Sequence, residues 1–125
     1  MSWDDERPMS PHLQVYKLPL TANLSILHRG TGTVLFVGLI LMVWVLAAGA
    51  AGSESWQSMH GFLSSWFGKL VLFGFTFSLY YHLCNGIRHL FWDIGKGLDL
   101  EDARKSGKLV IVASAILTLM TWLIA

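Results

Sequence analysis

Two histidines and several other polar residues lie close together near the end of a long apolar segment. They belong to the run His82-Leu83-Cys84-Asn85-Gly86-Ile87-Arg88-His89-Leu90-Phe91-Trp92-Asp93-Ile94. On a helix, residues three, four, seven and eleven positions apart share one face. Ionisable side chains are costly inside a membrane helix and usually mark a functional site. The spacing therefore predicts one polar, functional face, made of His82, Asn85, Gly86, His89 and Asp93.

The chemistry that this face suggests is haem ligation. Neutral imidazole is a common axial ligand of haem iron, and helix bundles hold cofactors with side chains of facing helices. His82 is the better candidate, because roughly two to three helical turns separate it from the expected membrane boundary near Trp92. His89 lies nearer that boundary, where it would contact a haem propionate or water. A second interpretation stays open, in which His82 hydrogen-bonds to a neighbouring helix without a metal.

A second polar cluster lies at the start of the first apolar segment. Ser25, His28 and Arg29 occupy positions i, i+3 and i+4, so they share a helix face. A hydroxyl, an imidazole and a guanidinium beside apolar surface would bind a lipophilic substrate with carbonyl groups and deliver protons to it. Arg29 would equally neutralise a haem propionate. The alternative is an arginine that reaches toward the membrane surface beside a capping serine.

Three apolar segments must position these clusters. The chain has 125 residues, of which 54% are hydrophobic and 14% charged, which is unlike an ordinary soluble domain. Residues 30–52, 70–87 and 109–125 contain no Asp, Glu, Lys or Arg. Each approaches the roughly 20 residues that cross a hydrocarbon core. We expect an all-α, integral membrane-anchor domain spanning 1–125, with a cytoplasmic segment at 1–20 and transmembrane helices at about 22–52, 62–94 and 104–125.

The residues between these segments indicate where the helices begin and end. Thr21 or Asn23 is a candidate cap for the first helix. Ser53-Glu54-Ser55 marks the first loop, and Gly95-Lys96-Gly97 is expected to end the second long helix. Asp99-Leu100-Glu101-Asp102 is an acidic start for the third, because carboxylates stabilise helix N-termini.

The basic residues predict the orientation of the chain. Eight of the nine lie before the first segment or around the connection between the second and third, a strong positive-inside bias. The N-terminus is therefore expected in the cytoplasm or the mitochondrial matrix. Its acidic start, Met1–Glu6, differs from a transit peptide or a secretory signal, which favours a bacterial inner membrane. The eight are Arg7, Lys17, Arg29, Arg88, Lys96, Arg104, Lys105 and Lys108, and the ninth is Lys69.

Three motifs, in the same order along the chain, resemble the cytochrome b membrane-anchor subunits of succinate dehydrogenase, respiratory complex II. They are Arg7-Pro8-Met9-Ser10-Pro11-His12-Leu13, Ser25-Ile26-Leu27-His28-Arg29-Gly30-Thr31-Gly32 and His82-Leu83-Cys84-Asn85-Gly86-Ile87-Arg88-His89. The resemblance implies that His82 is an axial ligand of haem b and that the other axial histidine belongs to a second, small anchor subunit. It also implies that Ser25 and Arg29 line a ubiquinone pocket, and that His28 and Arg29 lie near the haem propionates, the vicinity already expected for His89.

The resemblance further implies partners for the chain. A flavoprotein subunit and an iron–sulfur subunit would dock on the two anchors, which form a heteromeric helix bundle in the lipid. This chain has neither a flavin-binding glycine motif nor a cysteine cluster, so FAD and the iron–sulfur clusters belong to the partners. The chain alone is not expected to be catalytic, and no nucleic-acid partner is expected. Two alternatives remain: an anchor of a menaquinone-dependent fumarate reductase and a haem-free structural anchor.

Arg88 and Asp93 are two further charged residues whose roles we expect to be structural. Arg88 would pair with a haem propionate, pair with Asp93, or extend toward lipid headgroups. Asp93 would contact the iron–sulfur subunit or remain solvated at the interface.

Overall fold

The structure, a computed structural model, describes residues 17–125, and its regular elements in this range are all helices. They are α1 (Leu20–Ala50), α2 (Ser53–Ser64), α3 (Trp66–Asp93) and α4 (Leu100–Ile124). The helices α1, α3 and α4 are long and apolar enough to cross a membrane. The predicted all-α membrane protein with three spanning helices is thus confirmed. The first of the three resembling motifs, Arg7–Leu13, lies outside the described residues.

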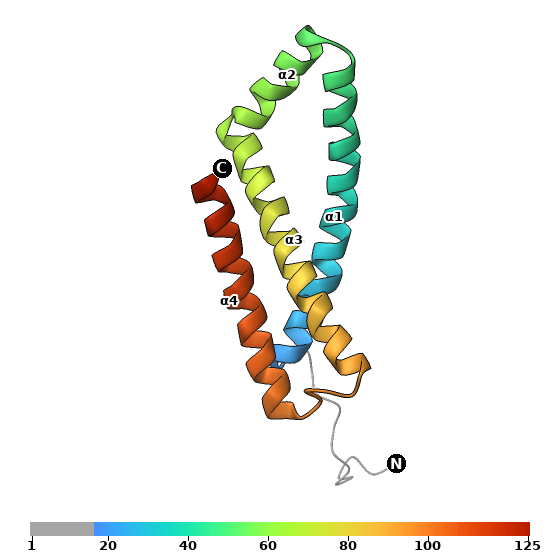
Figure 1. The fold of residues 1–125 in the computed structure, drawn as a ribbon, viewed down its shortest axis with the longest axis vertical. Coiled ribbons are helices and arrows are strands. Elements are labelled where there is room, and N and C mark those ends of the chain that lie inside the picture. The colour runs from blue at the N-terminus through green and yellow to red at the C-terminus, as the bar shows by residue number, and fades with distance from the viewer. Residues whose placement is uncertain (1–16) are drawn as a thin grey trace, which may run out of the picture.

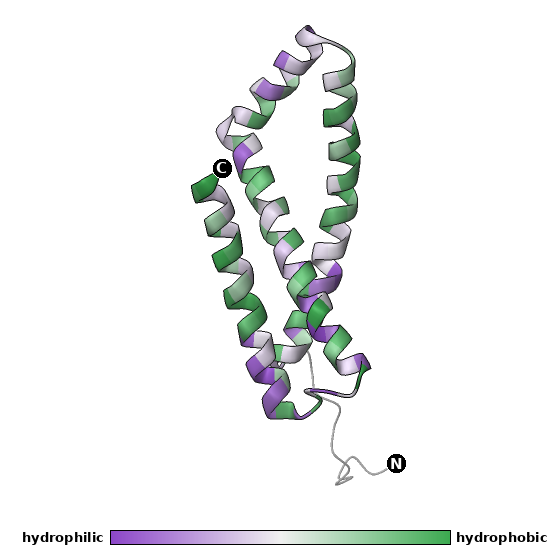
Figure 2. Ribbon diagram, in the orientation of Figure 1, coloured by the Kyte–Doolittle hydropathy of each residue, from purple (hydrophilic) through white to green (hydrophobic). Residues whose placement is uncertain are grey.

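The three long helices run alternately up and down (Figure 1). The helix α3 lies between α1 and α4 and packs against both of them. The start of α1, the end of α3 and the start of α4 lie at the same end of the molecule, here called the polar end. Hydrophilic residues gather there, whereas the middle of the long helices is hydrophobic (Figure 2). Large apolar side chains such as Phe36 and Trp44 are about two-thirds exposed, at 66% and 65%. Such surfaces require lipid or other membrane chains around them.

The buried core is small and joins the three long helices near the polar end. Leu24 of α1, Tyr81 of α3 and Val110 of α4 form its centre. Gly107 allows α4 to approach α1 here, because a Cβ atom at this position would lie 2.5 Å from Leu24 Cδ1. The contact is too short for any larger residue without movement of a neighbour. The core therefore supports the same end of the molecule that carries the predicted functional residues.

The connection between the first two spans is a helix, contrary to the sequence prediction. Ser53-Glu54-Ser55 was expected to be a loop, but it begins the 12-residue helix α2. Its first turn contains Glu54, whose carboxylate interacts favourably with the helix dipole. The chain then bends at Ser65, which has an extended backbone conformation. Ser65 Oγ accepts a hydrogen bond from the Gly68 N–H at 3.1 Å and so caps α3.

The start of α1 also differs from the prediction. Thr21 and Asn23 were the expected caps, but both lie inside the helix, and the N-cap residue is Pro19. No side chain caps this terminus. The Pro19 carbonyl instead accepts hydrogen bonds from the backbone N–H groups of Ala22 and Asn23, both at 3.1 Å. Proline has a fixed φ and no N–H of its own, so this terminus has one N–H group fewer that needs a partner.

The connection between α3 and α4 follows the sequence prediction. Gly95 and Gly97 adopt φ values of +78° and +72°, which favour glycine, and α3 ends just before them at Asp93. Asp99 is the N-cap of α4, and acidic residues occupy the first turn. The helix thus begins at Leu100, about one turn before residue 104. This short connection holds the ends of α3 and α4 together at the polar end.

Candidate functional site

Three imidazoles meet where α1 and α3 pack together near the polar end. The rings of His28 and His82 are stacked, with centroids 4.0 Å apart and planes 7° from parallel. The His89 ring is 5.3 Å from that of His28, at an angle of 54°. The fold thus brings together histidines from both of the motifs that the sequence indicated, although about fifty residues separate them.

The hydrogen bonds of His82 are arranged as in a metal-binding histidine. Its Nδ1 atom is 3.2 Å from the backbone carbonyl oxygen of His28 and 3.2 Å from Thr31 Oγ1. A carbonyl only accepts, so the bond to His28 assigns the proton to Nδ1. Within residues 17–125, Nε2 then has no hydrogen-bond partner. Metal-binding histidines usually donate their second ring N–H to a carbonyl or carboxylate in this way, so His82 fits an axial ligand.

The His82 ring packs closely against Gly32 of α1, and an apolar cavity begins next to this contact. A Cβ atom at Gly32 of α1 would lie only 3.1 Å from Cε1 of the imidazole. Gly32 also borders an apolar cavity of about 840 Å³ between α1 and α3, which is lined farther along by Phe75 and Leu79. Any larger residue at Gly32 would therefore press on the ring.

His28 and its two motif neighbours, Ser25 and Arg29, differ in burial. The His28 ring is half-buried against α3, and its Nδ1 atom is buried with no hydrogen-bond partner in residues 17–125. Ser25 and Arg29 lie exposed on α1. No hydrogen bond or ion pair within the described chain engages their side chains. The motif thus offers an imidazole to the inside of the bundle, and a hydroxyl and a guanidinium to a molecule outside it.

A second polar network lies on a different side of α3 and was not recognised in the sequence. Arg88 is only 5% exposed. Its Nε donates to Ser106 Oγ at 2.9 Å, Nη1 to Asn85 Oδ1 at 3.1 Å, and Nη2 to the Ala103 carbonyl at 2.9 Å. The guanidinium carbon also lies 4.1 Å from the Trp92 ring centroid, a cation–π contact. Arg88 therefore joins α3 to α4 and does not extend toward lipid headgroups.

This network changes the predicted polar face of α3. Asn85 was assigned to the side of His82, but it is fully buried and accepts its hydrogen bond from Arg88. Tyr81, also fully buried, donates from its hydroxyl to the Leu24 carbonyl of α1 at 2.7 Å. Tyr81, Asn85 and Arg88 have the spacing i, i+4 and i+7, which is the signal in the sequence for this second face. Asp93 is exposed at the end of α3 and does not pair with Arg88 in the described chain.

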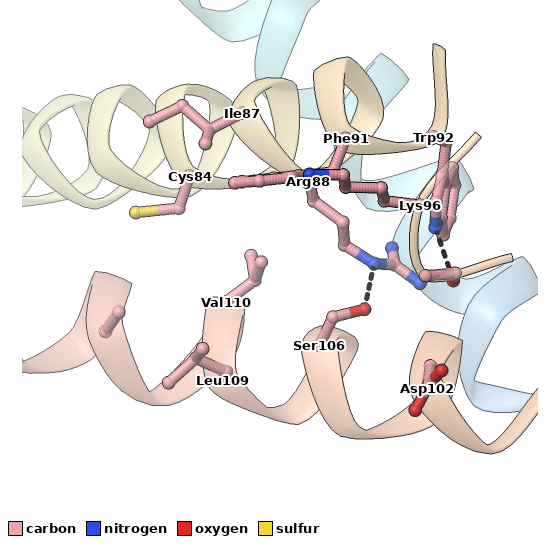
Figure 3. Close-up of a pocket in the computed structure, with 12 residues that line it drawn as sticks. Cys84, Ile87, Arg88, Phe91, Trp92, Lys96, Asp102, Ser106, Leu109 and Val110 are labelled. Atoms are coloured by element: carbon pink, nitrogen blue, oxygen red, sulfur yellow. Dashed lines mark hydrogen bonds between the residues drawn. The ribbon is translucent and has the colours of Figure 1, made fainter. Parts of the chain in front are cut away.

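A cavity of about 390 Å³ lies between α3 and α4 on the side of Arg88 (Figure 3). Cys84 and Ile87 of α3 face Leu109 across it, and Arg88 reaches over to Ser106. Of the residues for which a haem or quinone contact was expected, only Arg88 lines this cavity, and a propionate was one of its three expected partners. It is therefore a feature of the α3–α4 packing and is separate from the imidazole cluster.

The described chain does not hold a complete metal site of its own. Within residues 17–125, no group of three or more His, Cys, Asp or Glu side chains could hold a metal ion. Within the same residues, His82 Nε2 and the buried Nδ1 of His28 are imidazole nitrogens without a hydrogen-bond partner. A shared haem needs only one such axial ligand from each side.

The fold and this geometry define a multi-pass helical membrane protein with an imidazole cluster near one end. The family model described as "Succinate dehydrogenase/Fumarate reductase transmembrane subunit" matches residues 4–121. The chain therefore belongs to the family of succinate dehydrogenase/fumarate reductase transmembrane subunits.

Individual relatives agree with that family. The succinate dehydrogenase cytochrome b556 subunit of Paracoccus denitrificans is 42% identical over 118 residues, covering 94% of this chain and 91% of the relative. The subunit of the same name from Rickettsia felis is 41% identical, covering 94% and 92%. The succinate dehydrogenase cytochrome b560 subunit of Reclinomonas americana is 36% identical over 123 residues, covering 94% and 85%.

Proposed function

We propose that this chain is the cytochrome b membrane subunit of a succinate dehydrogenase and holds one side of a haem b. The family and the names of its relatives support the complex. The observation that carries the haem assignment is the hydrogen bond between His82 Nδ1 and the His28 carbonyl, which leaves Nε2 free for iron. His82 would bind the haem iron from this chain, and a histidine of the second anchor subunit would bind it from the partner. When bound, the haem supplies a one-electron redox centre in the membrane.

The neighbours of His82 have supporting roles in this proposal. His28 lies against His82, and His89 lies next to His28. Both imidazoles, together with the Arg29 guanidinium, would bind the haem propionates near the polar end. Charge-assisted hydrogen bonds of this kind are stronger than neutral ones and hold a carboxylate in a fixed position.

The quinone site would be formed by the exposed side of the same α1 turn. Ser25 would donate a hydrogen bond to one carbonyl of ubiquinone, and Arg29 would stabilise the negative charge that develops on reduction. His28 or nearby water would relay the protons. The exposure of Ser25 and Arg29 supports this assignment, because both side chains are available to a molecule outside the chain.

The complex would be oriented with the polar end in the cytoplasm of a bacterium. Among residues 17–125, the basic residues other than Lys69 belong to the first part of the chain through Arg29, the end of α3, the connection that follows it and the start of α4, as the positive-inside rule requires. The flavoprotein and iron–sulfur subunits would dock there, carrying FAD and the iron–sulfur clusters, and the small anchor subunit would cover part of the apolar surface. The enzyme would reduce ubiquinone with electrons from succinate, and this chain would contribute binding rather than the oxidation chemistry.

The quinone assignment can be tested with Arg29→Leu in the assembled four-subunit complex. We expect succinate–ubiquinone turnover to fall by about 100- to 1,000-fold, as when one donor to a developing oxyanion is removed. Succinate oxidation by an artificial acceptor should be unchanged, because the flavin and the iron–sulfur clusters lie elsewhere. Arg104→Leu, which removes another exposed arginine, is the matched control and should retain turnover. Unchanged quinone turnover and affinity in Arg29→Leu would remove Arg29 from the quinone site.

The family description covers fumarate reductases as well, so an anchor of a menaquinone-dependent fumarate reductase is the alternative function. The names of the relatives favour succinate dehydrogenase. Quinone extracted from the purified complex distinguishes the two, since ubiquinone is expected here. The optical spectrum of the same sample tests the haem-free anchor, because a b-type reduced-minus-oxidised signal is expected and its absence would refute the cytochrome assignment.

A further inference from the structure

We propose that Arg88 is a positioning residue that fixes the rotation of α3 and thereby directs the His82 imidazole toward the haem. This inference rests on the proposed role of His82 as an axial ligand. The guanidinium of Arg88 bonds to α4 and does not contact the imidazole cluster directly.

The guanidinium of Arg88 is held from several directions by neutral groups. It donates to a hydroxyl, a backbone carbonyl and a side-chain amide, and it stacks on an indole ring. Burying a charge is costly unless hydrogen bonds compensate for the loss of water. Asn85 and Trp92 belong to α3 itself and hold the guanidinium in place on that helix. Because the guanidinium is planar and its donors have fixed directions, a rotation of α3 would strain both of its bonds to α4, from Nε to Ser106 and from Nη2 to Ala103. The four groups belong to Ser106, Ala103, Asn85 and Trp92.

The opposite constraint on α3 comes from two adjacent residues that face α1. Tyr81 donates to the Leu24 carbonyl, and His82 donates to the His28 carbonyl, one helical turn farther along α1. The contact of Arg88 with α4 and the contacts of this pair with α1 hold α3 from two sides. Functional groups need to be fixed to roughly 0.5 Å and 10–20° to work well. If the bonds between Arg88 and α4 were lost, only the hydrogen bonds to α1 would orient His82.

Gly107 shows that these two constraints meet at one place. A Cβ atom at Gly107 would lie 3.6 Å from Arg88 Nη2 and 2.5 Å from Leu24 Cδ1. The α4 backbone, the α1 side chain and the guanidinium are thus packed against one another. A change in the position of Arg88 is therefore transmitted directly to the helix pair that carries His82 and its carbonyl partner.

Binding of a haem propionate is the competing role for Arg88, and the geometry is against it. Figure 3 shows the side chain extending across the α3–α4 cavity to Ser106. His82, in contrast, bonds to groups on α1. The charge of Arg88 is thus turned toward the bundle interior, and its guanidinium already has three hydrogen-bond acceptors there.

The test uses the assembled four-subunit complex and compares Arg88→Lys with Arg104→Lys, the same change at an exposed arginine. The readouts are the electron paramagnetic resonance spectrum of the low-spin ferric haem, the haem midpoint potential and the Tm. We expect Arg88→Lys to shift or broaden the low-field g value while haem content stays within about two-fold, because the ligand is present but wrongly oriented. Arg104→Lys should match the wild type.

A second variant, Ser106→Ala, removes one hydrogen bond from the guanidinium without touching α3. It should shift the same g value in the otherwise wild-type complex but add nothing to Arg88→Lys, since both changes act through one interaction. If Arg88→Lys does not assemble, the g value of Ser106→Ala decides alone. An unchanged spectrum would then refute the inference.

Two results in Arg88→Lys would overturn the inference in different ways. A lower Tm with an unchanged haem spectrum would make Arg88 a purely structural residue. An unchanged g value with a shifted midpoint potential would make it a charge partner of a propionate. Absence of haem from the wild-type complex would instead refute the proposed function, and it would be seen before any variant is compared.

Discussion

The two polar sides of α3 differ in whether the chain itself satisfies them. On the side of α4, all three hydrogen-bonding nitrogens of Arg88 have acceptors within the chain. On the side of α1, Nε2 of His82 and the buried Nδ1 of His28 have no partner in residues 17–125. Asn85 Nδ2 is an exception on the satisfied side, since it too lacks a partner in the described chain. Arg88 thus joins α3 to α4, whereas these two imidazoles each keep a nitrogen without a partner in the described chain, as the proposed haem site needs.

The largest effect that would test this comparison is expected at Gly32. Gly32→Leu should displace the His82 ring, because even a Cβ atom there lies 3.1 Å from Cε1. We expect most haem to be lost from the purified complex, as measured by haem content per flavin. Gly30→Leu is the control, since a Cβ at Gly30 meets no atom of the chain within 4 Å. Equal haem content in both variants would show that His82 does not need its close contact with α1.

A smaller effect, on stability, is expected where α4 packs against α1 and α3, at Gly107. Gly107→Ala should lower the stability of the complex by about 1–3 kcal/mol through overpacking against Leu24. Thermal dissociation of the purified complex measures this change. Gly74→Ala, at an exposed position of α3 with no chain atom within 4 Å, should be neutral or slightly stabilising. A Tm for Gly107→Ala at or above that of Gly74→Ala would contradict the close packing of α1, α3 and α4.

The smallest effect concerns the hydrogen bond of Tyr81. Tyr81→Phe removes the hydroxyl that donates to the Leu24 carbonyl and should cost about 0.5–1.5 kcal/mol. Tyr80→Phe is a useful comparison, because its hydroxyl pairs with Thr121 Oγ1 at 2.7 Å, away from the imidazole cluster. Both changes should lower the Tm slightly, but only Tyr81→Phe should alter the haem spectrum. Identical haem spectra in the two variants would argue that the α1 side of α3 is held without Tyr81.

The long helices could be predicted from the sequence, whereas α2 and the α1 cap could not. Uncharged runs of 17–23 residues leave few alternatives to a membrane helix, and α1, α3 and α4 coincide with these runs. In α2, polar residues such as Glu54 and His60 alternate with apolar ones over only 12 residues, so its pattern did not differ from that of a loop. At Pro19, helix initiation depends on backbone groups rather than on a capping side chain.

The side on which Asn85 lies could not be decided from spacing alone. At about 100° per residue, Asn85 is about 60° around α3 from His82 and about 40° from Tyr81. It therefore borders both faces, and the position of Arg88 and of α4 decides between them. The sequence likewise indicated the motifs of His28 and His82 separately. Their contact could not be predicted, because it depends on how α1 and α3 cross.

The proposed haem site requires that His82, and not His89, binds the iron, and optical spectra of two variants distinguish the two histidines. His82→Ala and His89→Ala are introduced into the same four-subunit complex, and reduced-minus-oxidised spectra are recorded at equal flavin content. We expect His82→Ala to lose the six-coordinate, low-spin b-type signal, because the bond from Nδ1 to the His28 carbonyl leaves Nε2 of His82 for iron. His89→Ala should retain the signal. An unchanged low-spin signal in His82→Ala would show that His82 is not the ligand.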